Sequence, residues 1–228
     1  AFGHSLEKDA TEMVKANGGN VVGSVRHPLN ASDFSSFIMQ AQASKAQVIG
    51  MANATQDAVN TIKASREFGI VDKGQKLAAL MLQVTDVHAM GLQVAQGLVS
   101  SEGFYWDLDD QTRDFSARFE KVHKVKPNQV HAGVYSSVLH YLKSVAAAKS
   151  DAAPAVAAKM RELPIKDDVM RNASIRPDGR VVHDMLLVEV KKPAQSKAAW
   201  DYYNILGTIP ANTAFTPLAQ SQCSLVKK

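Results

Sequence analysis

The chain has 228 residues, with 26 Lys and Arg against 22 Asp and Glu for a formal charge of +4, and 46% of its residues are hydrophobic. These are ordinary globular values, so a disordered chain and a coiled coil are excluded. The single cysteine, Cys223, excludes an internal disulfide framework and a cysteine-built zinc site. The positive charge is spread without blocks, so nucleic acid is not expected as a partner.

The chain opens on a helix pattern rather than on a strand. Leu6, Ala10, Met13 and Val14 share one helical face, and Gly18 follows as a stop signal. In an α/β protein such a helix is normally preceded by a strand, and no signal-peptide pattern is present. We therefore expect either a processed product or a chain that lacks an N-terminal piece.

Three strand–loop–helix units follow. Strands are predicted at 20–25, 46–52 and 76–82, and helices at about 34–41, 56–68 and 85–94. The cluster from Asn30 to Asp33 is the capping signal of the first of these helices. This alternation is typical of βαβ units, so we expect a parallel sheet with helices on both faces.

The pattern changes after Gly97. An extended stretch at 98–106 is followed by three helices, predicted at about 112–123, 128–148 and 152–163. No strand separates them, and apolar side chains such as Phe115, Phe119 and Val122 require a sheet that this sequence does not contain. A hairpin is predicted at 171–190 around the turn from Arg176 to Gly179, and a last strand at 200–209.

Motifs for catalysis, metals and nucleotides are not found. The seven histidines show neither HxH nor HExxH spacing, and there is no GxSxG, GxxxxGKS/T or GxGxxG signature. No metal and no other cofactor is therefore expected, and an enzyme on a doubly wound sheet is the weaker alternative. Cys223 is interpreted as a surface thiol or as the disulfide partner of a cysteine outside this sequence.

Polar side chains gather where the predicted strands end. Asn53 and Thr55 follow the second strand, and Thr85 and Asp86 follow the third. Ligands of open α/β sheets bind at the carboxyl ends of strands, and the N–H groups of the next helix suit a carboxylate. For each of these residues taken alone, a role as a helix N-cap is the favoured interpretation. Phe2 is expected at the same edge, and the convergence of the loops favours a binding site.

The order of these parts resembles the periplasmic branched-chain amino-acid-binding proteins, which are type I solute-binding proteins of ABC importers. The resemblance covers essentially the whole chain, and it is carried by Phe-Gly at 2–3, ASDFS at 31–35, AQVIGM at 46–51, ASREFGI at 64–70, AQGL at 95–98 and FYWD at 104–107. The stretch KKPAQSKAAWDYY at 191–203 is similar to the subgroup that binds aromatic carboxylates.

The resemblance implies an α/β fold of two doubly wound parallel-sheet lobes joined by three crossing strands, the type I periplasmic-binding-protein fold, of which this chain is a C-terminal fragment. The expected parts are a C-terminal lobe without its first strand at 1–103, a crossing at 104–110, helices of the N-terminal lobe at 111–170, a hairpin and return crossing at 171–190, and a segment near the hinge at 191–228. Residues missing from the N-terminal side, about 100–150 of them, would supply the absent sheet.

The resemblance also places residues at a ligand. It implies an aromatic contact from Phe2 and a contact from Asn53 or Ala54. Where amino-acid binders carry a carboxylate for the ligand's ammonium, this chain has Gln83, or Asp86 in a shifted register. The expected ligand-binding residues are Phe2, Asn53, Ala54, Thr55, Leu82, Gln83 and Asp86, and the expected hinge residues are Phe104, Tyr105 and Trp106.

A neutral Gln83 would leave a buried ammonium without a counter-charge, at a cost of several kcal/mol. The expected ligand is therefore an aromatic or other organic carboxylate, captured by hinge closure in the periplasm and delivered to an ABC permease. The other expected partner is the missing N-terminal lobe segment or another copy of the chain. A ligand-sensing regulator of the same fold and a branched-chain amino-acid binder stay open as alternatives.

Overall fold

The computed structural model describes residues 1–224 and 226, and it divides into two compact units. Unit 1 comprises Ala1–Ser101 and Leu187–Leu206, and unit 2 comprises Glu102–Leu186 and the chain from Gly207 onward. The chain therefore passes between the units three times, after Ser101, after Leu186 and after Leu206. The predicted segment 191–228 includes residues 225, 227 and 228, which lie outside the described residues.

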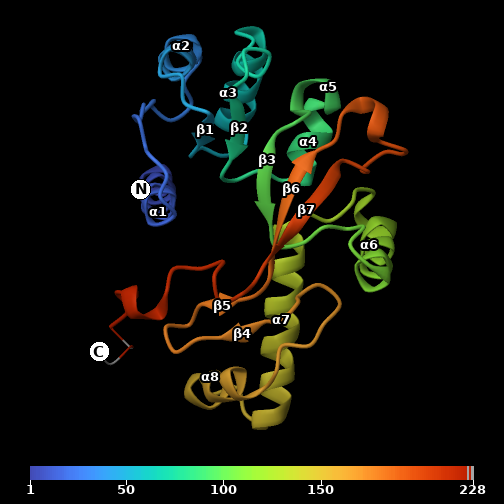
Figure 1. The fold of residues 1–228 in the computed structure, drawn as a ribbon. Coiled ribbons are helices and arrows are strands. Elements are labelled where there is room, and N and C mark those ends of the chain that lie inside the picture. Colours follow the sequence, from blue (N-terminus) through green and yellow to red (C-terminus); the bar gives the residue numbers. More distant parts are fainter. Residues whose placement is uncertain (225, 227–228) are drawn as a thin grey trace. The chain divides into compact units, whose positions relative to one another are not determined.

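A five-stranded sheet forms the framework of unit 1 (Figure 1), and its last strands on one side continue into unit 2. Its order is β1 (Val48–Met51), β2 (Lys76–Ala79), β3 (Val99–Glu102), β6 (Met185–Val190) and β7 (Tyr203–Ile209). The first three strands run parallel, with Val48 opposite Lys76 and Ala78 opposite Val99. The predicted parallel sheet is thus confirmed for these strands.

Five α-helices belong to the described part of unit 1. They are α1 (Phe2–Ala16), α2 (Ser35–Ala43), α3 (Thr55–Glu67), α4 (Val84–Met90) and α5 (Leu92–Ala95), and a 3₁₀ turn, η1, covers Pro193–Gln195. Ile62 of α3, Leu77 of β2 and Val87 of α4 are fully buried, so both helices and sheet contribute to the core of unit 1. The single helix predicted at 85–94 is wrong, because Gly91 has a φ of +78° and separates α4 from α5.

The strand predicted at 20–25 does not form. Residues 19–28 have no helix or strand, and Val22 and Val25 are 57% and 41% exposed. A strand is stabilised by its ladder with a neighbour, and β1, the nearest strand of the sheet along the chain, is an edge strand without a second described partner. Helix α1 forms as predicted, yet none of its residues is buried.

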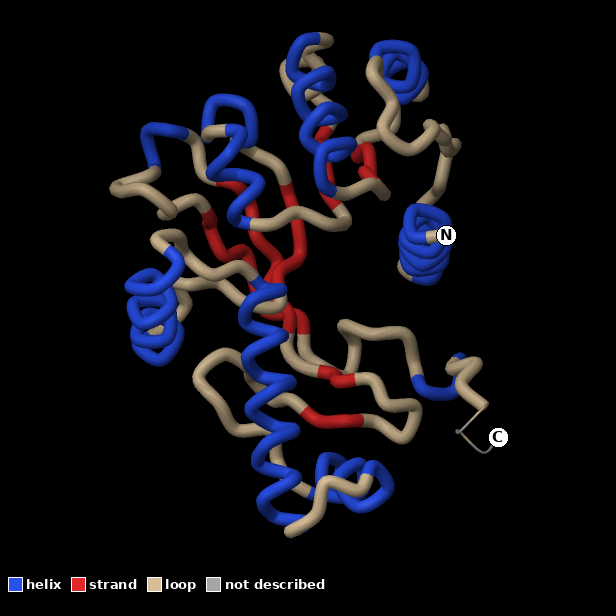
Figure 2. Tube along the Cα trace, turned by 180° about the vertical axis from the view of Figure 1, so that it is seen from behind, coloured by secondary structure: helices blue, strands red, loops and turns tan. Residues whose placement is uncertain are grey.

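Unit 2 is mostly helical. Its elements are α6 (Asp110–His123), α7 (Gln129–Ala148), α8 (Ala153–Glu162), the antiparallel pair β4 (Ser174–Ile175) and β5 (Val181–Val182), and a 3₁₀ turn, η2, at Leu218–Gln220. Figure 2 shows the β4–β5 ladder as two short red segments. Its turn is the predicted one, because Gly179 donates its N–H to the Arg176 carbonyl at 2.9 Å and has a φ of +80°.

The core of unit 2 partly corrects the expectation that its helices need an absent sheet. Phe115 is buried against Phe104, Ala132 and Val169, and the rings of Phe104 and Phe115 meet edge to face at 5.8 Å. Residues of this chain therefore cover one side of α6. Val122, at its other end, is 72% exposed and agrees with the expectation.

Helix α7 carries its large apolar residues on the exposed side. Its buried residues are small or polar: Ala132, Ser136, His140 and Ser144. Its exposed residues include Val130, Val134, Val138, Tyr141 and Leu142, with exposed fractions between 43% and 60%. The spacing of three and four residues places them on one helical stripe, which we call the α7 stripe.

Among the described residues, none of the helices could span a lipid bilayer.

Candidate functional site

The start of α1 lies against the end of β1. A Cβ atom on Gly3 would stand only 2.8 Å from the carbonyl oxygen of Ala52, so a glycine is required for this approach. Phe2 precedes that glycine and is 51% exposed. The start of α1, which carries Phe2, therefore lies beside the residues that follow β1 at one edge of unit 1. A contact between Phe2 and a ligand stays a prediction.

Asn53 follows β1 and is held by its amide nitrogen. Its Nδ2 donates to Thr61 Oγ1 at 2.8 Å and to His27 Nε2 at 3.2 Å. His27 Nδ1 lies 2.8 Å from the Pro28 carbonyl, which only accepts, so Nδ1 carries the hydrogen and Nε2 is the acceptor. The Oδ1 atom of Asn53 is buried and has no partner among the described residues.

The first turn of α3 lacks a side-chain cap. Ala54 is the N-cap and makes no capping hydrogen bond, so the N-cap alternative for Asn53 and Thr55 is wrong. Thr55 has a φ of +54°, a left-handed conformation that is strained for a β-branched residue. Asp57 is 6% exposed, and one of its carboxylate oxygens accepts the Asn30 N–H at 3.1 Å. The other oxygen is buried, and no described residue pairs with it.

The end of β2 presents Leu82, Gln83 and Asp86. Leu82 is fully buried. Gln83 is the N-cap of α4, and its main-chain N–H donates to the Asp86 carboxylate at 2.9 Å, so Asp86 has a capping role. Both polar atoms of the Gln83 side chain are buried and lack a hydrogen-bond partner among the described residues. An unsatisfied buried amide costs about 1–3 kcal/mol, which a polar ligand or an ordered water would remove.

The aromatic residues predicted for the hinge lie in unit 2, past the boundary after Ser101. Phe104 and Tyr105 are each 3% exposed. The Trp106 ring carries the Lys126 ammonium 4.5 Å from its centroid. These contacts anchor the segment after β3 within unit 2.

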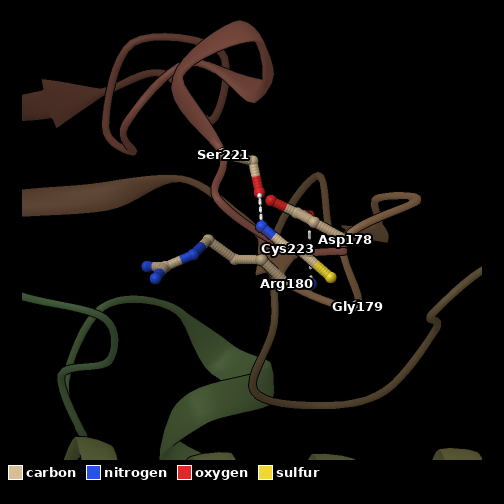
Figure 3. Close-up of a pocket in the computed structure, with 5 residues that line it drawn as sticks. All are labelled: Asp178, Gly179, Arg180, Ser221 and Cys223. Atoms are coloured by element: carbon tan, nitrogen blue, oxygen red, sulfur yellow. Dashed lines mark hydrogen bonds between the residues drawn. The ribbon is translucent and has the colours of Figure 1, made fainter. Parts of the chain in front are cut away.

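A shallow pocket lies elsewhere in unit 2, between the β4–β5 turn and the C-terminal segment (Figure 3). Asp178, Gly179, Arg180, Ser221 and Cys223 line it, and Ser221 Oγ accepts the Cys223 N–H at 3.3 Å. It contains none of the predicted site residues. Across residues 1–224 and 226, no three His, Cys, Asp or Glu side chains gather as a metal site.

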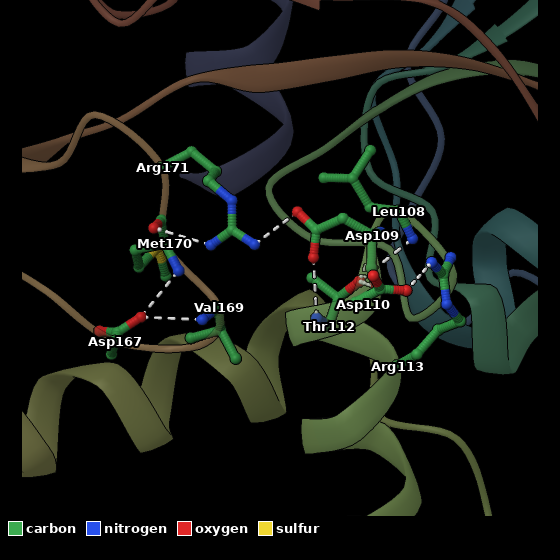
Figure 4. Close-up of polar contacts among 9 residues, drawn as sticks. All are labelled: Leu108, Asp109, Asp110, Thr112, Arg113, Asp167, Val169, Met170 and Arg171. Atoms are coloured by element: carbon green, nitrogen blue, oxygen red, sulfur yellow. Dashed lines mark hydrogen bonds and ion pairs between the residues drawn. The ribbon is translucent and has the colours of Figure 1, made fainter.

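A polar cluster that the sequence patterns did not predict joins α6 to the loop before β4 (Figure 4). Asp109, the N-cap of α6, accepts the Thr112 N–H at 2.9 Å and the Arg171 guanidinium at 2.6 Å. Partial burial would raise the pKa of Asp109, but the hydrogen bonds from Arg171 and Thr112 outweigh it and hold this pKa below its ordinary value. The Asp-x-x-Thr spacing signals the cap, whereas the partner 62 residues away leaves no local signal.

Comparison with known proteins gives this geometry a context. A sequence profile described as periplasmic binding protein matches residues 1–197. The chain belongs to the periplasmic binding protein family. The family consists of solute-binding proteins, and the predicted type I periplasmic-binding-protein fold is confirmed by the solved structures that superpose on the chain.

Two solved relatives of this periplasmic binding protein come from Burkholderia. The first is a periplasmic binding protein from Burkholderia mallei, with 50% identity and a TM-score of 0.93, covering 100% of this chain and 60% of its own. The second is a branched-chain amino-acid ABC-transporter periplasmic ligand-binding protein from Burkholderia xenovorans, with 40% identity and a TM-score of 0.90, covering 99% and 60%. The chain therefore spans about 60% of the length of these relatives.

A more distant neighbour shares the fold. It is a solute-binding protein of an ABC transporter from Rhodopseudomonas palustris, solved in complex with p-hydroxybenzoic acid. It is 22% identical, with a TM-score of 0.76, and covers 90% of this chain and 56% of its own. No curated protein gives a significant match.

The cap and ion pair at Asp109 generate a stability prediction. Replacing Asp109 with Ala removes the N-cap of α6 and leaves Arg171 without its carboxylate, so the free energy of unfolding in urea should fall by about 1–2 kcal/mol. Asp110→Ala is the matched control, because the Asp110 side chain is 96% exposed and its pair with Arg113 lies at the surface. Equal losses in the two variants would contradict the assignment.

Asp86 generates a pH prediction. Burial raises the pKa of Asp86, so the folded state holds its proton more tightly than the unfolded state does. The free energy of unfolding of the wild type minus that of Asp86→Asn should therefore decrease as the pH rises from about 4 through the pKa of Asp86 in the folded state. Urea unfolding of both proteins from about pH 3 to about pH 7 measures this difference. A difference that is constant or rises with pH would contradict it.

Proposed function

We propose that this periplasmic binding protein captures a small organic carboxylate, with an aromatic acid as the favoured class, and delivers it to an ABC permease. The unpaired amide of Gln83 is the observation that carries the proposal. Its Nε2 donates and its Oε1 accepts, and both atoms are buried at the carboxyl end of β2 with no partner in the part of the chain that the structure describes. A carboxylate or a phenolic hydroxyl would satisfy them.

At the carboxyl end of β2, the side chains of Gln83 and Asp86 favour an acid over an amino acid. Gln83 is neutral, and the Asp86 carboxylate is already occupied by the Gln83 main-chain N–H. An ammonium beside Gln83 would have no counter-charge from Gln83 or Asp86, and its desolvation would cost several kcal/mol unless it reached the unpaired oxygen of Asp57 in the first turn of α3. The uncapped first turn of α3 instead presents N–H groups, whose partial positive charge suits an anion. Phe2 at the same edge would supply an aromatic contact.

The proposed mechanism is a closing motion about the three crossings. A ligand that contacts both units in the closed form shifts the equilibrium toward it, and the permease distinguishes closed from open protein. Such capture needs no covalent step. We place the protein in the periplasm because the relatives are described as periplasmic. A sensor domain of the same fold would bind in the same way but act without a permease.

A branched-chain amino acid is the second candidate ligand, because the Burkholderia xenovorans relative carries that description at 40% identity. Calorimetric titration of the protein in its full natural length distinguishes the two. We expect heat from 4-hydroxybenzoate or a related aromatic acid and none from leucine. Nanomolar affinity for leucine together with no response to benzoate-like acids would refute the proposed ligand class.

A variant that adds a negative charge at Gln83 tests whether this residue contacts the proposed carboxylate ligand. Gln83→Glu keeps the shape of the side chain but introduces a carboxylate, so affinity for an aromatic acid should fall at least about tenfold through like-charge repulsion. Gln93→Glu, at an exposed position of α5, adds the same charge and should leave the affinity unchanged. If the two variants bind the aromatic acid with equal affinity, Gln83 does not contact the ligand.

We further propose that the α7 stripe is covered by additional polypeptide, either a segment present in the relatives' greater length or another copy of this chain. Five large apolar residues on one helical face form the kind of patch that marks an interface. The opposite face of α7 is already buried and consists of small and polar residues. The chain's 60% coverage of its relatives leaves polypeptide for this role.

This covering predicts a position-specific loss of stability. In the full-length protein, Val134→Lys places a charge in the covered stripe and should lower the free energy of unfolding by about 2 kcal/mol or more. Ala147→Lys, at an exposed position of α7 outside the stripe, should change it by less than about 0.5 kcal/mol. If both variants melt like wild type, the stripe faces solvent.

A further inference from the structure

The three crossings are tied to one another inside unit 2. Asp184 stands immediately before β6, on the second crossing, and its Oδ1 accepts the N–H of Ala211, which follows β7 on the third crossing, at 2.9 Å. Its Oδ2 accepts from Asn172 Nδ2 at 2.6 Å, and its own N–H donates to the Arg171 carbonyl at 3.1 Å. One carboxylate therefore joins two crossings and the loop before β4.

The first crossing is held in the same place. Gly103 follows β3 directly and donates its N–H to Gln129 Oε1 at 2.8 Å. A Cβ atom at Gly103 would meet His183 Cε1 at 3.0 Å and Met185 Sδ at 3.6 Å. The first crossing thus packs on the two residues that flank Asp184, and the unit 2 ends of all three crossings form one block.

The third crossing is least restrained at its boundary. Gly207 is the first residue of unit 2 after Leu206, and it lies inside strand β7. It is exposed, as are Ile205, Leu206 and Thr208, and no atom would lie within 4 Å of a Cβ placed on it. A glycine inside an edge strand weakens the strand and permits rotation of the backbone.

We infer that Asp184 and Gly207 are positioning residues of the closing motion: Asp184 fixes the crossings to unit 2 as a block, and Gly207 provides backbone rotation in the third crossing. The inference rests on the proposed function for its role in capture, but the arrangement of fixed and free points is a property of the ligand-free chain. Rotation of the backbone is then concentrated between this block and the sheet of unit 1. Within unit 1, the Gly97 N–H donates to the Val190 carbonyl and joins the first and second crossing strands.

The variant Gly207→Ala tests backbone flexibility without introducing a steric clash. The φ of Gly207 lies outside the left-handed region and the added Cβ meets nothing, so alanine fits the existing backbone. Its effect is then to restrict the other backbone conformations that glycine allows. This restriction corresponds to roughly a two- to fivefold change in the relative populations of the open and closed forms. Gly50→Ala is the matched control, because Gly50 also lies in a strand with open space around it, but wholly within unit 1.

The experiment measures the distribution of distances between two spin labels in the full-length protein without ligand. One label is attached at Lys63→Cys in unit 1 and the other at Asp151→Cys in unit 2, and Cys223→Ser removes the native thiol. We expect Gly207→Ala to narrow the distribution and Asp184→Ala to broaden it. Gly50→Ala, and Asp178→Ala, which removes a carboxylate paired with Arg176 in the same hairpin, should match wild type. Gly207→Ala matching Gly50→Ala, or Asp184→Ala matching Asp178→Ala, would overturn the inference.

Asp184→Asn keeps the test valid if the alanine variant does not fold. Its amide oxygen still accepts the Ala211 N–H while the bond from Asn172 is lost, so the broadening should be intermediate. Titration with 4-hydroxybenzoate is a separate arm, in which Gly207→Ala should change the affinity roughly two- to fivefold. Wild type that binds no aromatic acid would refute the proposed function, whereas the ligand-free distances decide the inference about Asp184 and Gly207 by themselves.

Discussion

The strands that cross between the units are the constraint on which the rest of this molecule depends. Each of β3, β6 and β7 begins in one unit and ends in the other, because the boundaries after Ser101, Leu186 and Leu206 fall inside them. A strand must keep its main-chain hydrogen bonds, so the two units cannot separate freely.

The carboxyl ends of β1 and β2 concentrate buried polar atoms that have no hydrogen-bond partner within residues 1–224 and 226. Asn53 Oδ1, one oxygen of Asp57 and the whole amide of Gln83 share this property. Folded proteins tolerate such atoms rarely, because each lost hydrogen bond costs about 1–3 kcal/mol. Strain at Thr55 occurs at the same edge. The coincidence of unpaired polar groups, strain and an uncapped helix is what distinguishes this edge from ordinary capping loops.

Local patterns predicted the elements that depend on local interactions. Apart from the helix predicted at 85–94, the helices of both units, the Pro-Asp-Gly turn and the parallel strands at 48–51 and 76–79 are confirmed close to their predicted limits. Residues 20–25 have the composition of a strand but no described neighbour to pair with, so β-propensity alone did not form one. Gly91 ended α4 early because a positive φ cannot continue a helix.

The sequence by itself determined the α/β class, the family resemblance and the loops in which site residues lie, since these follow from periodicity and from residue order. Only the tertiary structure decided what each side chain does. The amide nitrogen of Asn53 donates to Thr61 and His27, and Asp86 caps α4. Both polar atoms of the Gln83 side chain lack a partner among the residues that the structure describes. The contacts of Asp184 with Ala211 and of Asp109 with Arg171 join residues 27 and 62 positions apart, and hydrogen bonds at such separations leave no periodic signal in a sequence.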